Sequence, residues 1–358
     1  MSFNVAAIAA AVPAIAADLH LPDFLVSRVI PAYMIPYGIG ALLYAPLARR
    51  LSFRVIMAST MGLYAVSSLL CARIELINHF FLARVATGIT GAAVIPLGLL
   101  LIGKMFEKGV RGRLVGLFFG CSFFSSVVGV FLSGVASWRY LFYVPAFLGA
   151  VAAFLILIVP SKDLSAREKN SVNYFNIIYN NKIRNIFIFI FTISFLYHGI
   201  HKWFGVYLSR DYNLSQFNIS LLFILMAVSG FVGQILGGYI SDKKGRLVSS
   251  LLGILVLGFA TLFFIGHYPL WILAIILCGT SIGWAIGHNG ASTALTDFPD
   301  EHRAEVASLN SSARFLSGGL GFFASAFFVE KSFSLTFFTI GILMLLLTFF
   351  VPKAIGRN

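Results

Sequence analysis

Long apolar runs recur along almost the whole chain, and short polar turns rich in Lys and Arg separate them. A helix that crosses the hydrocarbon core of a bilayer needs about 20 predominantly apolar residues. By that criterion the pattern predicts twelve membrane-spanning helices. The spans cover 1–18, 24–48, 53–73, 78–103, 113–136, 139–160, 184–208, 216–241, 247–267, 269–296, 303–329 and 333–352.

The composition is that of an integral membrane protein and excludes a water-soluble globular one. Hydrophobic residues make up 59% of the chain and charged residues 11%, whereas soluble domains are about half apolar and about a quarter charged. Spans that fill a chain of 358 residues leave no room for a soluble catalytic domain. The 3 cysteines are too few and too scattered for a disulfide framework or a zinc site. We therefore expect neither a metal nor a cofactor.

Basic residues outnumber acidic ones by 26 to 13, which gives a formal net charge of +13. Most of the bases lie in the turns between apolar runs, so the charge indicates membrane topology and not a nucleic-acid partner. They concentrate in the connections on the same side as the N-terminus. Because Lys and Arg favour the cytoplasmic side, we expect an inner (plasma) membrane protein with both termini in the cytoplasm.

The predicted spans divide into two sets of six. The division predicts an N-terminal six-helix bundle over 1–160, a basic cytoplasmic linker over 161–183 and a C-terminal six-helix bundle over 184–358. The segments 40–54 and 237–246 occupy the same position in each set, and both combine Gly with a short basic turn. This correspondence favours a duplicated six-helix unit.

Several short motifs occur in an order that resembles a known family of transporters. The segment Gly238-Tyr-Ile-Ser-Asp242-Lys-Lys-Gly245-Arg246 resembles the cytoplasmic loop signature of the major facilitator superfamily. Further likeness lies in segments 13–19, 84–88, 137–142 and 310–319. The resemblance implies an all-α integral membrane protein, with two six-helix bundles around a substrate site near the bilayer midplane. It also implies a monomer, and it points to the drug/proton antiporter branch.

The resemblance assigns a conformational role to the loop after span eight. In the family this loop holds one transport state through charge contacts with neighbouring helix ends. The acidic residue of the loop would lie at a helix N-terminus or meet an arginine, and the alternative is a solvated turn. The candidate latch residues are Gly238, Asp242, Lys243, Gly245 and Arg246.

The sequence departs from the patterns of the family and of its antiporter branch at three places. The loop after span two has Arg49 in place of Asp and Ser52 in place of Gly, so we expect it to latch weakly. In span five, Val130 and Ser133 replace the Pro and Gly of the antiporter motif. Asn4 stands where many members carry an Asp, which makes it the candidate polar residue of helix one. The first span is short, which leaves open whether part of helix one precedes the first residue.

No carboxylate lies clearly in the middle of a predicted span, so a simple acidic proton relay has no carrier. Span seven offers another set, because His198, His201 and Lys202 are spaced i, i+3, i+4 and share one helix face. The histidines would carry protons near neutral pH, and Lys202 would attract an anionic substrate. In the alternative interpretation, Lys202 extends to the outer face of the membrane near Arg210, and Trp203 is an interfacial belt residue.

Further polar and aromatic residues within predicted spans are candidates for the substrate or proton pathway. They are Tyr33, Tyr37, Arg84, His288, Asn289 and Arg314. Glycines in span ten would let helices approach or would break the helix, turning His288 and Asn289 toward the substrate. Each candidate also has a structural alternative. The tyrosines would serve packing, span ten would form an interhelical hydrogen bond, and the arginines would bond helix-end carbonyls.

We expect a secondary active transporter that works by alternating access, with a small molecule as cargo and protons as the coupling ion. Proton-coupled efflux of drug-like or amphipathic molecules fits the resemblance best. A facilitator or symporter of a small anionic metabolite fits the intramembrane bases Arg84, Lys202 and Arg314. A non-transporting receptor or scaffold on the same fold is the third possibility. No phosphate-binding loop with Lys-Ser/Thr and no HExxH motif occurs, so we expect neither an ATP-driven pump nor an enzyme.

Overall fold

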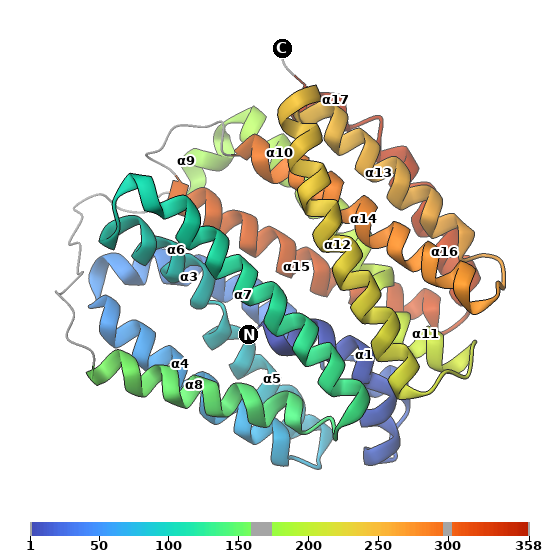
Figure 1. Ribbon diagram of the computed structural model, residues 1–358, viewed down its shortest axis with the longest axis horizontal. Coiled ribbons are helices and arrows are strands. Elements are labelled where there is room, and N and C mark those ends of the chain that lie inside the picture. Colours follow the sequence, from blue (N-terminus) through green and yellow to red (C-terminus); the bar gives the residue numbers. More distant parts are fainter. Residues whose placement is uncertain (1, 159–173, 296–302, 357–358) are drawn as a thin grey trace.

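The computed structural model describes residues 2–158, 174–295 and 303–356, and all regular structure in these ranges is helical (Figure 1). The first half of the chain contains α1 (Ser2–Leu19), α2 (Asp23–Ser27), α3 (Pro31–Arg50), α4 (Phe53–Arg73), α5 (Ile77–Gly91), α6 (Val94–Met105), α7 (Lys108–Val135) and α8 (Tyr140–Ile158). The second half contains α9 (Tyr174–Tyr179), α10 (Asn181–His201), α11 (Phe204–Arg210), α12 (Gln216–Lys244), α13 (Arg246–Phe263), α14 (Leu270–Ala294), α15 (Arg303–Val329), α16 (Phe333–Leu347) and α17 (Val351–Ile355).

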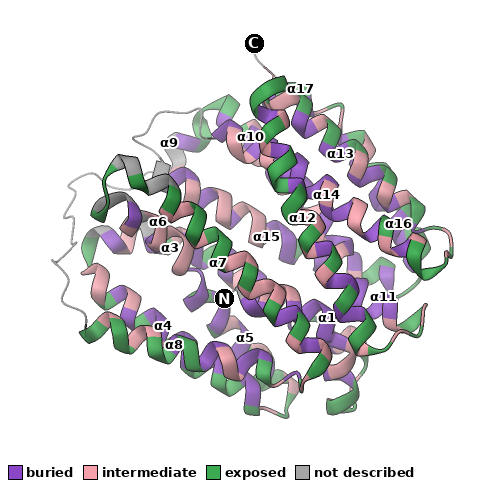
Figure 2. Ribbon diagram, in the orientation of Figure 1, coloured by how far each residue is buried: buried purple, intermediate pink, exposed green. Residues whose placement is uncertain are grey.

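The twelve predicted spans appear as helical passes. Among the described residues, 10 helical segments are long and apolar enough to cross a bilayer, and α1 and α16 are shorter apolar helices in the other two positions. The prediction of an all-α membrane fold with twelve transmembrane helices is confirmed. Exposed positions run along the outward faces of the helices (Figure 2). Many of them are apolar, such as Phe124 and Phe147, each 68% exposed.

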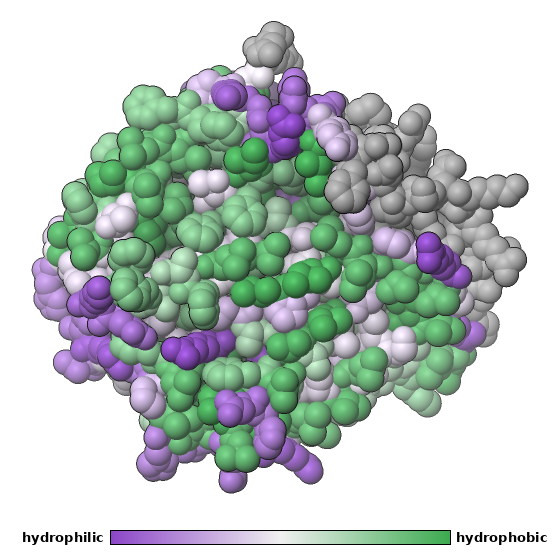
Figure 3. All heavy atoms as spheres, turned by 180° about the vertical axis from the view of Figure 1, so that it is seen from behind, coloured by the Kyte–Doolittle hydropathy of each residue, from purple (hydrophilic) through white to green (hydrophobic). Residues whose placement is uncertain are grey.

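This apolar exterior marks the surface that faces lipid. Figure 3 shows hydrophobic side chains over most of the visible face, with hydrophilic side chains gathered toward its margins. A soluble protein rarely exposes a contiguous apolar area of this extent. In a bilayer the arrangement is stable, because helices satisfy their own backbone hydrogen bonds inside the hydrocarbon region.

Several spans are less regular than predicted. The span at 78–103 is divided between α5 and α6, because Pro96 has no N–H to donate one turn back and its ring crowds the carbonyl there. The span at 184–208 is divided between α10 and α11. The span at 333–352 ends early as a helix, since α16 stops at Leu347 and α17 follows after a turn.

Specific pairs of helices pack against each other within each half and between the halves. Within the first half, α4 packs against α8 and α5, α3 against α5, and α1 against α7. Within the second half, α14 packs against α12 and α13, and α10 against α15. Between the halves, α3 packs along α15, α7 along α12, and α1 against α11 and α12. The predicted linker at 161–183 lies mostly outside the described residues, and its described part includes α9.

The halves contact each other closely at one end of the helices. We call the end that contains Asp23 and Arg210 the Arg210 end. The opposite end, which contains the loop between α12 and α13, is the Arg246 end. At the Arg210 end, Arg210 Nε donates to Asp23 Oδ2 at 2.8 Å, and Gln216 Nε2 donates to the Ala10 carbonyl oxygen at 3.0 Å. Gly205 of α11 lies directly against the Ala9 carbonyl, where a side chain would overlap it. These contacts close the halves against each other at the Arg210 end.

Candidate substrate site

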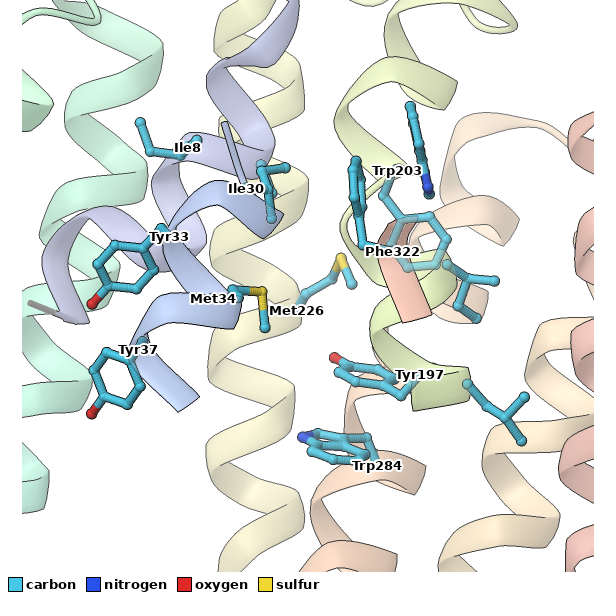
Figure 4. Close-up of a cluster of buried hydrophobic side chains, with 14 of the residues drawn as sticks. Ile8, Ile30, Tyr33, Met34, Tyr37, Tyr197, Trp203, Met226, Trp284 and Phe322 are labelled. Atoms are coloured by element: carbon cyan, nitrogen blue, oxygen red, sulfur yellow. The ribbon is translucent and has the colours of Figure 1, made fainter. Parts of the chain in front are cut away.

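His198 of α10 lies at the seam between the two halves. The backbone of α15 passes so close at Gly318 that an added Cβ there would lie 2.6 Å from His198 Cδ2 and 2.5 Å from Met34 Cε. Met34 belongs to α3 of the first half, so both halves contribute to this contact. Figure 4 shows Met34 between Tyr37 and the aromatic pair of the second half. The missing side chain at Gly318 therefore lets helices of both halves converge on His198.

An aromatic stack supports the histidines on the second half. The rings of Tyr197 and Trp284 are parallel, with centroids 4.5 Å apart and an interplanar angle of 2°. Trp284 also contacts His198 at 5.4 Å and His288 at 4.9 Å between ring centroids. The Tyr197 hydroxyl and the Trp284 ring nitrogen lie at the same end of the stack (Figure 4). Sequence reasoning missed both aromatic residues, although Trp284 lies one helical turn before His288.

Basic side chains gather around this stack without an acidic partner. The electrostatic neighbours of His198 are Lys202, His201, Arg314 and His288, and no Asp or Glu is among them. Arg314 Nε, His198 Nδ1 and His201 Nδ1 are buried and have no hydrogen-bond partner among the described residues. The structure thus brings together five of the predicted site residues from α10, α14, α15 and the turn after α10.

The ion pairs of the described chain lie elsewhere. They join Asp18 to Arg139, Asp23 to Arg210, and Asp242 to Arg246. Each pair stands near a helix end or in a connection, as the sequence predicts for the carboxylates. In the described part of the protein, the ion pairs therefore leave the Arg314 guanidinium at the centre without a carboxylate partner.

Lys202 and Trp203 occupy the turn between α10 and α11, and both are buried. Lys202 is 4% exposed, and its Nζ lies 3.5 Å from the Val5 carbonyl oxygen on α1. Trp203 is 1% exposed, donates from Nε1 to Ser325 Oγ at 3.0 Å and stacks on Phe322. The alternative interpretation, in which Lys202 extends to the membrane surface and Trp203 is a belt residue, is wrong. Packing against α1 and α15 holds both side chains inside.

Arg84 forms the centre of a second polar cluster, inside the first half. Its Nε donates to the Val29 carbonyl oxygen at 3.1 Å, and its guanidinium lies 4.4 Å from the centroid of the Tyr33 ring. The carbonyl bond matches the structural alternative for this arginine, yet Nη1 has no partner among the described residues. Asn4 is completely buried, and both polar atoms of its amide are unpartnered as well.

Tyr33 and Tyr37 stand one turn apart on α3 and connect the two clusters. Their ring centroids are 5.7 Å apart, and both hydroxyls are buried without a hydrogen-bond partner among the described residues. Figure 4 shows the two hydroxyls pointing to the same side. The centroid of the Tyr37 ring lies 3.8 Å from the centroid of the Phe315 ring of α15, across the seam. Tyr33 therefore belongs to the Arg84 cluster, and Tyr37 lies next to the central bases.

The structure separates His288 from Asn289. The α14 helix continues through its glycines without a break, and Gly283 and Gly287 let it approach α13 at Gly253. His288 lies in the basic cluster, and its ring nitrogens lie 3.3 Å from Ser292 Oγ. Asn289 instead donates from Nδ2 to Gln234 Oε1 at 3.1 Å on α12. Asn289 thus forms the interhelical hydrogen bond that the structural alternative describes.

The candidate latch folds into a tight turn between α12 and α13. Arg246 Nη1 donates to Asp242 Oδ1 at 2.9 Å and to Ser241 Oγ at 3.1 Å. Gly245 has φ +91°, in the left-handed region that favours glycine. Lys243 Nζ lies 4.8 Å from the centroid of the Tyr239 ring. Gly238 has open space where a side chain would stand. Asp242 meets an arginine as predicted, and that arginine belongs to the same turn.

Two solved structures with a similar fold are described as transporters. The structure is similar to the nucleoside transporter NupG, with a TM-score of 0.78 and 13% identity over 99% of this chain and 96% of that chain. It is also similar to a bacterial homologue of the human lysosomal transporter Spinster in an inward-facing and unoccupied conformation. The TM-score there is 0.72, with 14% identity over 99% of this chain and 93% of that chain. The chain has the same overall fold as these two proteins.

The sequence comparisons assign the family. The model of the Major Facilitator Superfamily matches residues 1–322, and the chain belongs to this family. It is therefore a transporter and not an enzyme.

One segment, 279–283, matches the Gly-x-Ser-x-Gly pattern that hydrolases use to present a nucleophilic serine. In hydrolases the pattern forms a strand-to-helix turn, whereas here the segment lies inside the continuous helix α14.

Individual relatives are distant. The chain is 24% identical over 310 residues to an uncharacterized MFS-type transporter, YwfA, of Bacillus subtilis, which covers 82% of this chain and 74% of that protein. It is 30% identical over 146 residues to azole resistance protein 1 of Saccharomyces cerevisiae, covering 39% of this chain and 24% of the yeast protein. It is 27% identical over 172 residues to the putative multidrug resistance protein MdtD of Yersinia pestis. The match covers 44% of this chain and 35% of the Yersinia protein.

Proposed function

We propose that the protein transports small organic anions across the membrane by alternating access. The observation that carries the proposal is the group of His198, His288 and Arg314 at the seam, whose electrostatic partners include no carboxylate. Unpaired charge inside a membrane protein is costly, and intramembrane bases mark substrate or ion pathways. A bound anion would offset this cost while it is carried.

The surroundings of these bases favour an anion with an apolar part. The stacked rings of Tyr197 and Trp284 stand beside His198 and His288. At the same seam, the Tyr37 ring of the first half packs on the Phe315 ring of α15. Binding sites for small molecules combine mostly apolar walls with a few polar groups that fix the orientation of the ligand. We infer that the bases hold the carboxylate of the substrate and that the aromatic rings contact its body.

Alternating access would require the contacts that join the two halves at the Arg210 end to break and re-form during each cycle. By the distribution of Lys and Arg, we place this end outside the cytoplasm, both termini inside the cytoplasm, and the protein in the inner (plasma) membrane. The substrate then enters from the cytoplasmic side in this state. The bundle of 1–160 would rock against that of 184–358 as a monomer, and His198 and His288 would exchange the coupling proton.

A second candidate function is proton-coupled efflux of drug-like or amphipathic molecules. The names of the yeast and Yersinia relatives, which refer to azole and multidrug resistance, favour it. The aromatic stack suits planar, apolar cargo as well. The two candidates differ in the charge of the cargo, because the central bases would repel the cationic dyes that many such efflux proteins carry.

Thermal unfolding of the purified protein in detergent tests the proposal. Ligands that bind the folded state raise the unfolding midpoint. Benzoate should raise it, and the neutral isostere benzamide and a cationic dye should not. Arg314→Gln should lose the benzoate effect, whereas Arg73→Gln, at an exposed position at the end of α4, should keep it. Equal effects of benzoate and benzamide would contradict an anionic substrate, and a shift by the dye alone would favour the second candidate.

A further inference from the structure

Arg84 is a buried cation with no acidic neighbour, and it lies apart from the seam. Its side chain is 1% exposed, and its electrostatic partners are Cys71, Tyr33 and Tyr64. All of these residues belong to the first half, as does Phe142, whose ring centroid lies 5.7 Å from the guanidinium. A single guanidinium sealed among uncharged groups leaves one positive charge uncompensated, which destabilises the fold unless a counterion is bound.

Hydrogen-bond donors without partners surround this cation. Four helices contribute them. The unpartnered buried atoms are Asn4 Nδ2 of α1, Tyr33 Oη of α3, Tyr64 Oη and Ser68 Oγ of α4, and Arg84 Nη1 of α5. Asn4 and Ser68 both interact with the Tyr64 hydroxyl, and Tyr64 interacts with Arg84. Buried polar groups are nearly always hydrogen-bonded, so this gathering of unsatisfied donors around a positive charge indicates a ligand that accepts hydrogen bonds.

The orientation of Ser68 gives independent support. Other hydroxyls on the same helix donate to carbonyl oxygens one turn back, as Ser67 does to Leu63 at 2.8 Å and Thr60 does to Ile56 at 2.8 Å. This backbone bond is the default for a buried Ser or Thr inside a helix. Ser68 is completely buried, its hydroxyl makes no bond to a backbone carbonyl of the described residues, and its interaction is with the Tyr64 hydroxyl one turn back. Its hydroxyl therefore belongs to the cluster with Tyr64 and is not used by the backbone of its own helix.

We propose that Arg84, Tyr64 and Ser68 bind a small monovalent inorganic anion of the size of chloride inside the first half. One unit of negative charge balances the one guanidinium. The hydroxyls and the amide of Asn4 donate hydrogen bonds that a halide accepts. Each of these donor atoms is buried, so the site suits a compact ion. This site is separate from the seam and does not depend on which substrate the transporter carries.

Chloride-dependent stability tests the proposal. The unfolding midpoint of the purified protein is measured in sodium gluconate while chloride replaces gluconate at constant ionic strength. We expect a saturable upward shift of a few degrees in the wild type. Ser68→Ala and Tyr64→Phe should lose the shift. Ser67→Ala removes the neighbouring hydroxyl that bonds its own helix, so it should keep the shift in full.

Three outcomes of the unfolding experiment would overturn the assignment. A wild-type midpoint that is independent of chloride means that the donors are satisfied by water alone. A chloride effect that is unchanged in both Ser68→Ala and Tyr64→Phe places the ion elsewhere. Stabilisation by acetate or benzoate but not by chloride, lost in Ser68→Ala, assigns the pocket to the substrate carboxylate. An anomalous bromide peak beside Arg84 in crystals grown with bromide would confirm the site directly, and a peak only at the seam would refute it.

Discussion

Asp23 of α2 and Arg210 of α11 form an ion pair across the two halves, with Arg210 Nε donating to Asp23 Oδ2 at 2.8 Å. The Arg210 guanidinium also lies 4.4 Å from the centroid of the Phe24 ring. Another pair at the same end, Asp18 with Arg139, joins α1 to the start of α8 within the first half. Of these two described ion pairs, the Asp23–Arg210 pair is the one that must break when the halves separate at this end.

Removal of this pair should favour the state in which the Arg210 end is open. Because partly exposed ion pairs contribute about 1 kcal/mol or less, Asp23→Asn should shift the ratio of the two states by at most about fivefold. Distances between spin labels on α2 and on the loop after α11 measure this ratio. Arg139→Gln is the matched control and should leave it unchanged. A change of the same size in Arg139→Gln would mean that neither pair reports on closure.

The close approach of Gly205 to Ala9 predicts a stronger effect. A methyl group at Gly205 would overlap the Ala9 carbonyl, so Gly205→Ala should prevent full closure at the Arg210 end and reduce transport more than Asp23→Asn does. Gly62→Ala on α4 is the control, because its new Cβ meets no atom within 4 Å. Normal transport by Gly205→Ala, with normal expression, would show that this contact is not part of the transport cycle.

His198 should be essential for transport because it lies against α3, α14 and α15 and shares the basic cluster. His198→Ala should lower the transport rate by at least about tenfold, equivalent to about 1.4 kcal/mol in the barrier, without loss of expression. His267→Ala serves as the control, since His267 is exposed and stacks on Tyr212 in the connection after α13. Transport at the normal rate by His198→Ala would remove this residue from the pathway.

Asp242 should affect the conformational cycle more than substrate binding. Asp242→Asn removes the charge that holds Arg246 at 2.9 Å in the turn between α12 and α13. We expect a slower transport rate with an unchanged ligand-induced shift in the unfolding midpoint. Lys243→Gln, which leaves the Asp242–Arg246 pair intact, should have a smaller effect on rate. A parallel loss of binding and rate in Asp242→Asn would argue against a conformational role for the turn.

The fold could be predicted because the length of an apolar run is a local property of the sequence. The break between α5 and α6 also had a local signal in Pro96, one turn after the break. The break between α10 and α11 had none. Lys202 and Trp203 include neither Pro nor Gly, and their burial depends on contacts with Val5 and Ser325, which lie far away in the sequence.

The candidate site was predictable only within single helices. The spacing of His198, His201 and Lys202 indicates a shared face, but their proximity to His288 and Arg314 depends on how α10, α14 and α15 pack. The stacking of Tyr197 on Trp284 is a contact of the same kind. Residues of common types in packed helices, such as Tyr64 and Ser68, had no sequence signal, because only the tertiary structure shows that their hydroxyls lack partners.

Uptake of radiolabelled benzoate into proteoliposomes tests most directly the claim that the central bases carry an organic anion. The wild type is predicted to accumulate or exchange benzoate, Arg314→Gln to be at least about tenfold slower, and Arg73→Gln to match the wild type. Radiolabelled benzamide should cross no faster than in empty liposomes. Transport of benzamide or of a cationic dye at the wild-type rate in Arg314→Gln would contradict the proposal that the basic cluster selects an anion.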